Sequence, residues 1–185
     1  MMAMESLRGK LLVASPAIDD PNFHRTVILL GHHDRDGALG VVINRPAGAS
    51  ITEAAPPVAE MLGDGEDEMF CGGPVMPEAV VVVAEFEDPA DAAILAFDSV
   101  GVLGADSGRA DIERRTKRLR AFAGHAGWSR GQLDAEMERD DWIVAPAKAD
   151  HVFSAEPENL WAEVLSELGG QFELLSRMPE DPSVN

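Results

Sequence analysis

The stretch TVILLGHHDRDGALGVVIN, residues 26–44, decides which fold we expect for this chain. Its first five residues have the β-branched content of a strand, and its last six, LGVVIN, have the same character. Between them, Asp36-Gly37 supplies the residue with positive φ that a tight hairpin turn requires. The stretch therefore predicts two antiparallel strands joined by a short turn.

Further strands are expected on both sides of this hairpin. They are LLVAS at 11–15, AVVVVAEF at 79–86, RLRAFAG at 118–124 and WIVAP at 142–146. The unbroken apolar run of residues 79–86 predicts a strand that is buried on both faces.

Three helices are expected, at residues 50–62, 129–139 and 157–168. The first is interrupted or restarted at Pro56-Pro57, because proline is tolerated only in the first turn of a helix. Residues 87–97, EDPADAAILAF, fit either a helix or a strand. Because hairpins come first and helices later, we expect an α+β fold with a mainly antiparallel sheet.

Length and composition predict one globular domain. The chain has 185 residues, 45% of them hydrophobic, and no repeat or low-complexity linker divides it. We expect a single domain over residues 1–178 and a flexible acidic tail over residues 179–185. No apolar run is long enough to cross a bilayer, and Cys71 is the one cysteine. These features predict a cytoplasmic protein that has no membrane partner.

Charge is the most decisive bulk property. The chain has 15 Lys and Arg against 33 Asp and Glu, which gives a net charge of −18. Such a surface repels the phosphate backbone, so direct binding to nucleic acid is not expected. Six of the cations lie within residues 109–120, where we expect a solvated surface with Asp111–Arg115 and Glu113–Lys117 ion pairs.

The segment Gly127-Trp128-Ser129-Arg130-Gly131 matches G-x-S-x-G, the pattern of a nucleophile elbow. Ser129 would then be a catalytic nucleophile, with His125 or His151 as its base. The same serine starts Ser129-x-x-Gln132, a capping box in which Gln132 bonds back to the first N–H of the cap. Capping explains Ser129 and Gln132 together, and we favour it.

Two other groups are interpreted as structural. Cys71 precedes a double glycine, has no cationic neighbour in the sequence, and is expected to be an inert core thiol. His32 and His33 are neighbours on a strand, so they point to opposite faces and do not share an ion. The chain has no zinc-binding spacing of His or Cys, and we expect neither a metal nor a cofactor.

Polar residues cluster before the second strand and after the third. The candidate binding residues are Asp19, Asp20, Asn22, Arg25, Asn44 and Arg45. If the two strands pair as a hairpin, both groups meet at the end opposite the turn. They form either a binding pocket or a buried network that satisfies loop backbone groups.

Several blocks of this sequence resemble the YqgE/AlgH family. They are GKLLVASPAIDDPNFHRTVILLGHHDRDGALGVVINRP, GGPV, GHAGWSRGQLDAEM, WIVAPA and ENLW, which span about residues 8–168. The resemblance implies an α+β fold whose split sheet forms a pseudo-barrel with helices packed around it. Family members are labelled transcriptional regulators, but no catalytic set comes with the fold.

Two positions depart from the family pattern. The family usually has a tyrosine where this chain has His125, and often a residue other than serine at position 129. The resemblance therefore implies no shared nucleophile. We expect a cytoplasmic, non-enzymatic regulatory protein that acts through a protein or small-ligand contact. The alternative is a small serine hydrolase that uses Ser129.

Overall fold

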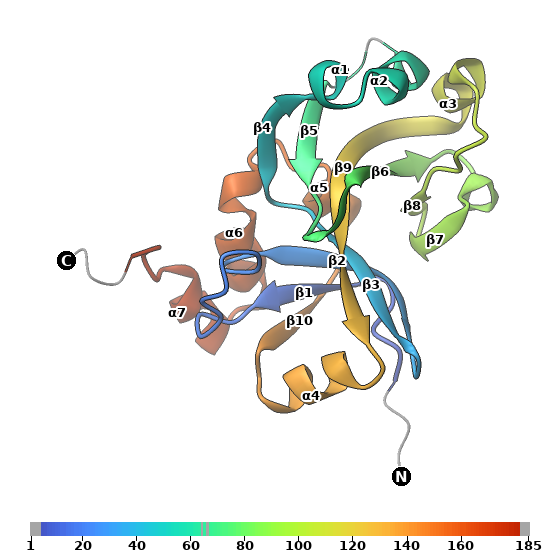
Figure 1. The fold of residues 1–185 in the computed structure, drawn as a ribbon. Coiled ribbons are helices and arrows are strands. Elements are labelled where there is room, and N and C mark those ends of the chain that lie inside the picture. The colour runs from blue at the N-terminus through green and yellow to red at the C-terminus, as the bar shows by residue number, and fades with distance from the viewer. Residues whose placement is uncertain (1–4, 64, 66, 182–185) are drawn as a thin grey trace.

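The computed structural model describes residues 5–63, 65 and 67–181, and within them the chain forms ten strands and short helices (Figure 1). The strands are β1 (Lys10–Ala14), β2 (Val27–Asp34), β3 (Gly37–Val42), β4 (Pro46–Ser50), β5 (Glu68–Cys71), β6 (Val75–Phe86), β7 (Ile94–Phe97), β8 (Val100–Val102), β9 (Thr116–Ser129) and β10 (Trp142–Pro146). The α-helices are α1 (Ile51–Ala54), α2 (Pro56–Leu62), α3 (Arg109–Arg115), α4 (Gln132–Glu138), α5 (Ala149–Val152), α6 (Leu160–Leu168) and α7 (Gln171–Ser176).

One long strand, β9, belongs to both halves of the sheet. Along the sheet the order is β10-β1-β2-β3-β9-β6-β8-β7, and β5 adds to β9 in parallel. The C-terminal end of β9 pairs with β3, where Ala38 faces Trp128. Its N-terminal part pairs with β6, where Val81 faces Phe122. Except for the β5–β9 pair, these pairings are antiparallel.

The expected α+β fold and its split, mainly antiparallel sheet are confirmed. The sheet is curled but not closed into a barrel, since β10 and β7 stand at opposite ends of the strand order. The curl brings β7 against the turn before β1, where Arg8 Nε donates to Leu95 O at 3.1 Å. At the same place Gly9 packs so closely on Ala96 O that a Cβ would lie 2.5 Å from it.

The β2–β3 hairpin forms as predicted. Leu29 faces Val41, and the turn lies at Arg35-Asp36, between the paired residues Asp34 and Gly37. A β-bulge at Gly31 shifts the register, so Leu30 and His32 face consecutive partners on β3. The hairpin therefore keeps the predicted strands, and β2 runs four residues beyond the expected end at Leu30.

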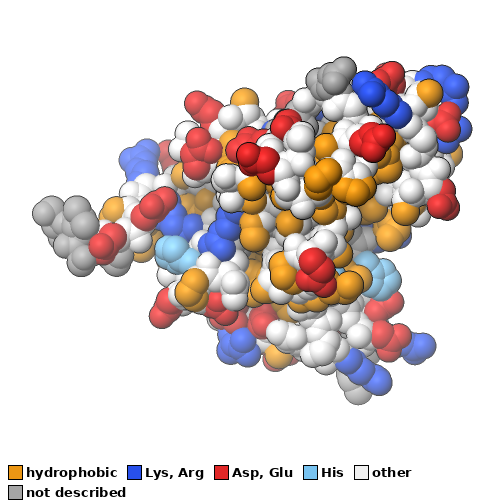
Figure 2. All heavy atoms as spheres, turned by 45° about the horizontal axis from the view of Figure 1, so that its top comes forward, with side chains coloured by type: hydrophobic (Ala, Val, Ile, Leu, Met, Phe, Trp, Pro, Cys, Tyr) orange, Lys and Arg blue, Asp and Glu red, His pale blue; other side chains and the backbone are white. Residues whose placement is uncertain are grey.

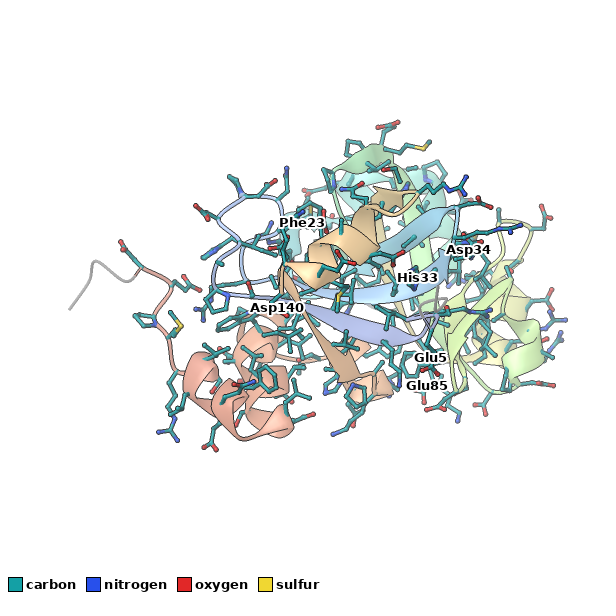
Figure 3. The ribbon with its side chains drawn as sticks, turned by 90° about the horizontal axis from the view of Figure 1, so that it is seen from below. Glu5, Phe23, His33, Asp34, Glu85 and Asp140 are labelled. Carbon is teal, nitrogen blue, oxygen red and sulfur yellow. The ribbon has the colours of Figure 1, made fainter. Side chains whose placement is uncertain are left out.

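Helices cover both faces of the sheet. Buried residues of α6, Trp161 among them, pack on β1, β2 and β3, and Trp161 Nε1 donates to Ala14 O at 2.8 Å. On the other face, Leu133 of α4 packs on the same three strands. A third cluster joins Ile51 of α1 and Ile112 of α3 to β6 and β9. Viewed from below, α4 lies across the blue strands, between the labelled Phe23 and His33 (Figure 3).

Two sequence expectations need correction, and one question that the sequence leaves open is resolved. Residues 87–97 form both elements, a short 3-10 helix at Pro89–Asp91 and then strand β7. Cys71 is exposed at the end of β5, whereas Met69 and Phe70 before it are buried in two different core clusters. Helix α3 ends at Arg115, so Lys117 lies on a strand and is 4.0 Å from Glu87 rather than paired along a helix.

The remaining ion pairs of this region also differ from the expected ones. Arg115 contacts Asp91 at 3.7 Å, and Arg114 contacts Asp111 at 2.6 Å. The surface is solvated and paired as expected, but the partners follow the three-dimensional fold. Within the described residues, no helix is long and apolar enough to cross a membrane. Residues 182–185 of the predicted tail lie outside the described residues.

Candidate functional site

Arg45 organises the loop that precedes β2. Its Nη1 donates to Pro21 O at 2.7 Å and to Asn22 O at 2.8 Å, and its Nη2 donates to His24 O at 2.7 Å. Burial lowers the pKa of the Arg45 guanidinium, and the nearby Cys71 and Asp20 oppose that shift. One side chain thus binds three carbonyls of the loop.

Asn44 fixes the point where this loop enters the sheet. Its Oδ1 accepts from Val27 N at 2.9 Å, and its Nδ2 donates to Arg25 O at 2.9 Å. Asp20 Oδ1 accepts from Asn22 N at 2.8 Å within the same loop. The structure therefore brings Asn44, Arg45, Asp20 and Asn22 together as contacts that shape the loop.

Asp19 and Arg25 instead line a cavity of about 250 Å³. The Arg25 guanidinium lies 3.9 Å from the centre of the Trp161 ring, and its Nη1 donates to Met178 O at 2.9 Å. Burial lowers the pKa of Arg25, and the charge of Glu180 acts in the opposite direction. Residues 178–180 also line the cavity, so the start of the predicted tail lies against it.

Ser129 lies at the end of β9, before α4. Its Oγ donates to Gln132 Oε1 at 3.2 Å, and its backbone N donates to the same oxygen at 3.0 Å. The second bond is one half of the expected capping box, but the N-cap itself is Gly131. The partner of the hydroxyl is an amide oxygen, which is not a general base.

Gln132 extends this contact into a network around Glu136. Gln132 Nε2 donates to Glu136 Oε1 at 3.1 Å, and Glu136 Oε2 accepts from Trp128 Nε1 and Trp142 Nε1, both at 2.8 Å. The two indole rings cross edge to face at 6.0 Å. Glu136 therefore ties α4 to β9 through Trp128 of the GWSRG segment and to β10 through Trp142.

The histidines proposed as a base lie elsewhere. His151 is buried on α5, where its Nδ1 accepts from Lys148 N at 3.1 Å and its Nε2 is 3.0 Å from Glu167 Oε2. His125 is half-buried on β9 and faces a groove. Among the hydrogen bonds found in the described residues, Ser129 has neither histidine as a partner.

That groove is apolar and lies between the two halves of the curled sheet. Its volume is about 220 Å³, and β2, β3, β6, β7 and β8 contribute to its walls. Of the lining residues, Leu39 on β3 is 48% exposed and Ile94 on β7 is 53% exposed. Deeper in the groove, Leu29 and Val83 belong to the main core. His125 is the one lining side chain with a titratable group.

Exposed apolar residues continue beside the groove. Val75 pairs with His125 and is 38% exposed, and Met76, which has φ of 48°, is 55% exposed. A Cβ on Gly127 would lie in contact with both Leu39 and Val75, so these two side chains are neighbours. Figure 2 shows one face of the molecule, on which hydrophobic side chains gather toward the middle.

His32 and His33 lie on opposite faces of β2, as expected. His32 is exposed and pairs with Asp34 at 2.9 Å, whereas His33 is buried and its Nδ1 accepts from Leu7 N at 2.9 Å. Across residues 5–63, 65 and 67–181, no group of three or more His, Cys, Asp or Glu side chains is arranged to hold a metal ion.

A family model described as AlgH-like matches residues 11–173. The chain belongs to this AlgH-like family. A UPF0301 protein of Streptomyces avermitilis is 39% identical over 191 residues, which cover 100% of this chain and 98% of the relative. A UPF0301 protein of Thermobifida fusca is 36% identical over 97% of this chain and 96% of its own. These matches confirm the resemblance found in the sequence.

Two solved structures share the AlgH-like fold. The crystal structure of protein DIP2367 from Corynebacterium diphtheriae superposes with a TM-score of 0.83, at 27% identity over 95% of this chain and 94% of that one. The solution structure of the AlgH protein from Pseudomonas aeruginosa gives a TM-score of 0.71, at 26% identity over 96% and 98%. The names of these relatives state no activity.

Sequence reasoning missed the groove of this AlgH-like chain. Leu39 was part of the expected strand, and alternation along it would have turned Leu39 away from its buried neighbour Ala38. Strand alternation therefore predicts that Leu39 faces outward, but it does not predict which other residues line the groove. Ile94 comes from residues 87–97, which fit either a helix or a strand, and only the curl of the sheet brings it to the same groove as Leu39.

Proposed function

We propose that this AlgH-like chain is a cytoplasmic, non-enzymatic regulatory protein that acts by binding a partner protein at the apolar groove. The observation that carries the proposal is that two half-exposed side chains, Leu39 of β3 and Ile94 of β7, line the same apolar groove. Contiguous exposed apolar surface on a monomer is typical of interaction sites.

The size of the groove favours a protein partner over a free small molecule. Sites for drug-sized ligands have volumes of about 300–1,000 Å³. At about 220 Å³ and with exposed apolar residues beside it, the groove suits one or two apolar side chains of a partner. The net negative charge favours a partner whose apolar anchor is flanked by Lys or Arg, because complementary charge speeds association.

Regulation through a protein contact also fits the charge of the chain better than regulation through DNA. A surface with 33 carboxylates and 15 cations repels nucleic acid. Any effect on transcription would then pass through the bound protein. The proposal assigns no catalytic role to the hydroxyl of Ser129, which donates to Gln132 Oε1.

Site-specific photocrosslinking in the native host tests this proposal. p-Benzoylphenylalanine is placed at Leu39 or Ile94, and at Leu174, which is 71% exposed on α7, as the matched control. We expect the same adduct from positions 39 and 94 and no such adduct from position 174. Equal adducts from all three positions, or an adduct with a second copy of this chain, would refute the proposal.

A second experiment repeats the crosslinking in a variant whose new side chain fills the groove. Gly31 lines the groove, and a Cβ there would meet only Leu39 O, at 3.9 Å, with no positive φ to oppose a side chain. Gly31→Leu should therefore fold and remove the adduct from Ile94, whereas Gly31→Ala should keep it. Persistence of the adduct in folded Gly31→Leu would show that the partner binds elsewhere.

A further inference from the structure

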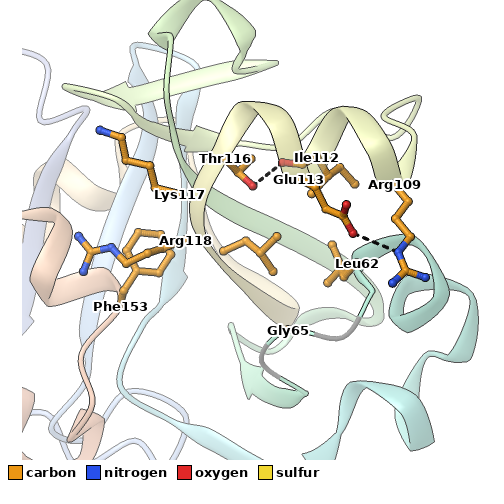
Figure 4. Close-up of a pocket in the computed structure, with 10 residues that line it drawn as sticks. Leu62, Gly65, Arg109, Ile112, Glu113, Thr116, Lys117, Arg118 and Phe153 are labelled. Atoms are coloured by element: carbon orange, nitrogen blue, oxygen red, sulfur yellow. Dashed lines mark hydrogen bonds and ion pairs between the residues drawn. The ribbon is translucent and has the colours of Figure 1, made fainter.

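A cavity of about 520 Å³, here called the β10 cavity, lies between β10 and α7. It differs from a cavity of about 450 Å³ between α2, α3 and the start of β9, where charged side chains face one another in ion pairs such as Arg109–Glu113 (Figure 4). Among the described residues that line the β10 cavity, Asp140 is the one with a charged side chain. Its polar character comes largely from the main chain of β10.

The β10 cavity lies along the edge of the strand rather than on one of its faces. Trp142 and Val144 contribute to the core cluster beneath α4, whereas Ile143 between them packs on the cluster beneath α6. All three residues line the cavity. Because successive residues of a strand point to opposite faces, a cavity that contacts all three lies along the main chain. In the described part of the chain β10 is the last strand of the sheet order, with β1 as its partner.

The ladder between β1 and β10 determines which main-chain groups face the cavity. Ser15 N donates to Asp141 O at 2.9 Å, so this pair occupies a hydrogen-bonded position. Such positions alternate along an antiparallel ladder, and the next one on β10 is Ile143. The N–H and C=O groups of Trp142 and Val144 therefore point away from β1 and toward the cavity.

These outward groups are open to a further strand. Within the described residues, no hydrogen bond engages the main-chain N–H or C=O of Trp142 or Val144. At the other end of the sheet, by contrast, Leu95 O of β7 accepts from Arg8 Nε at 3.1 Å. Ser15, which also lines the β10 cavity, has a buried Oγ that lacks a partner among the described residues. An unpaired strand edge is a template for the main chain of another segment.

The opposite wall of the β10 cavity is apolar. Phe172 and Leu175 of α7 line it, and both also pack on the main core. A strand edge that faces a wall of apolar side chains suits β-augmentation, in which main-chain hydrogen bonds give affinity and pockets for alternate side chains give specificity.

Asp140 gives the cavity a negative charge at the start of β10. It is exposed where α4 leads into the strand (Figure 3). Its neighbour Arg139 pairs with Asp141 at 2.7 Å, and Asp140 has no ion pair within the described residues. A complementary segment therefore carries a Lys or Arg at this end.

We propose that the β10 cavity binds an extended segment of a partner protein, which adds to the edge of β10 as a further strand. Its main chain pairs with Trp142 and Val144, an apolar side chain packs on Phe172 and Leu175, and a Lys or Arg reaches Asp140. A second copy of this chain is a poor occupant, because each copy has a net charge of −18. The cavity shares no lining residue with the apolar groove, so this surface is independent of the proposed function.

Amide hydrogen exchange of the full chain, followed by NMR, tests whether the edge is open. The amides of Trp142 and Val144 should exchange at least tenfold faster than those of Ile143 and Ala145, which bond to β1. Equal protection at all four positions would show that the edge is already covered and would overturn the proposal.

Selection from a phage library of random peptides tests the occupant. The library is selected on the full chain and then depleted of peptides that bind Val144→Pro, which lacks the outward N–H. Proline is tolerated on an edge strand where its nitrogen faces away from the ladder, and circular dichroism and Tm establish that the variant is folded. We expect peptides with alternating apolar residues and a Lys or Arg, which bind Val144→Pro at least tenfold more weakly and slow amide exchange at Trp142 and Val144.

A milder pair of variants tests the charge by fluorescence anisotropy of the selected peptides. Asp140→Asn removes the carboxylate, and Asn tolerates the φ of 58° at this position. Asp98→Asn is the matched control, because Asp98 is also exposed, has φ of 44° and lies in the turn between β7 and β8. The peptides should bind Asp140→Asn at least fivefold more weakly than the parent chain, and Asp98→Asn within twofold of it.

Three further results would overturn the proposal. A library without peptides that distinguish the parent chain from Val144→Pro would show that the edge accepts no strand. Equal affinity for Asp140→Asn and Asp98→Asn would remove the role of the carboxylate. Protection of Trp142 and Val144 that rises with the concentration of the free chain would make a second copy the occupant.

The groove variant separates this proposal from the proposed function. Gly31→Leu fills the apolar groove and should leave the affinity of the selected peptides within twofold of the parent chain. Loss of peptide binding in that variant would place the peptides in the groove and overturn the assignment to β10. Because the photocrosslinking positions lie outside the β10 cavity, the two proposals fail independently.

Discussion

Neighbouring residues of one strand can have opposite environments, as His32 and His33 do on β2. His32 is in solvent beside Asp34, and His33 is buried with its Nε2 3.4 Å from Asp134 Oδ1. Strand alternation allowed their separation to be predicted from the sequence. The burial of His33 could not be predicted in this way, because it depends on α4, which begins about a hundred residues later.

The loop network predicts that Asn44 contributes more to stability than its neighbours. Asn44→Ala removes the partners of Val27 N and Arg25 O, and leaving a buried backbone group without a partner costs about 1–3 kcal/mol. Urea unfolding should show a loss of about 2–3 kcal/mol. Asn22→Ala, which keeps the backbone oxygen that Arg45 binds, is the control and should change stability by less than about 0.5 kcal/mol.

The lowered pKa of Glu167 predicts that the stability of the fold depends on pH. Burial alone would raise its pKa, but hydrogen bonds from Lys148 and His151 outweigh burial and hold the pKa below the ordinary value. A depressed pKa in the folded state stabilises the fold above the unfolded pKa, and this contribution is lost as the pH falls through the folded pKa.

Unfolding free energies measured from pH 7 down to pH 3 test this. The advantage of the parent chain over Glu167→Gln should shrink as the pH falls below the ordinary glutamate pKa, near 4.5. A difference that is constant across that range would contradict the assigned role of the ion pair.

At the scale of elements, local signals predicted the strands of the hairpin and the restart of the helix at Pro56, but not the length of β9. The sequence indicated a strand at 118–124 and a helix from Ser129, whereas β9 continues to Ser129. Gly124, with φ of 75°, and Gly127 lie within it and locally argue against a long strand. Pairing with β3, β5 and β6 overrides that preference, and such distant partners leave no local trace in the sequence.

Around the junction of β3 and β9, we expect the substitution of two glycines by alanine to lower the free energy of unfolding by different amounts. Gly37 has φ of 146°, and a Cβ there would lie 2.4 Å from Trp128 O. Gly37→Ala should therefore lose about 2–4 kcal/mol, from backbone strain and overpacking together. Gly131 has φ of 74° but open space around it, so Gly131→Ala should lose only about 1 kcal/mol. Equal losses in thermal unfolding would show that the close contact at Gly37 is unimportant.

At the scale of the whole molecule, the excess of carboxylates opposes compaction. At neutral pH the net charge is −18, so the excess carboxylates repel one another, and salt screens that repulsion. Raising NaCl from 10 to 300 mM at pH 7 should raise Tm by about 2–4 °C, which corresponds to roughly 1 kcal/mol. At pH 4.5, near the isoelectric point, the same salt should have little effect. A fall in Tm at pH 7 would mean that ion pairs outweigh repulsion.

Because β9 belongs to both halves of the sheet, the order in which the ribosome makes the strands affects how the sheet is assembled. The ribosome completes β3 at Val42, but the strand that joins β3 to the other half-sheet is finished only at Ser129. At roughly 5–20 residues per second, the nascent chain waits several seconds with an unpaired edge on β3. During that interval the hairpin edge is open to other strands, so chaperones that shield nascent chains would matter most before β9 is made.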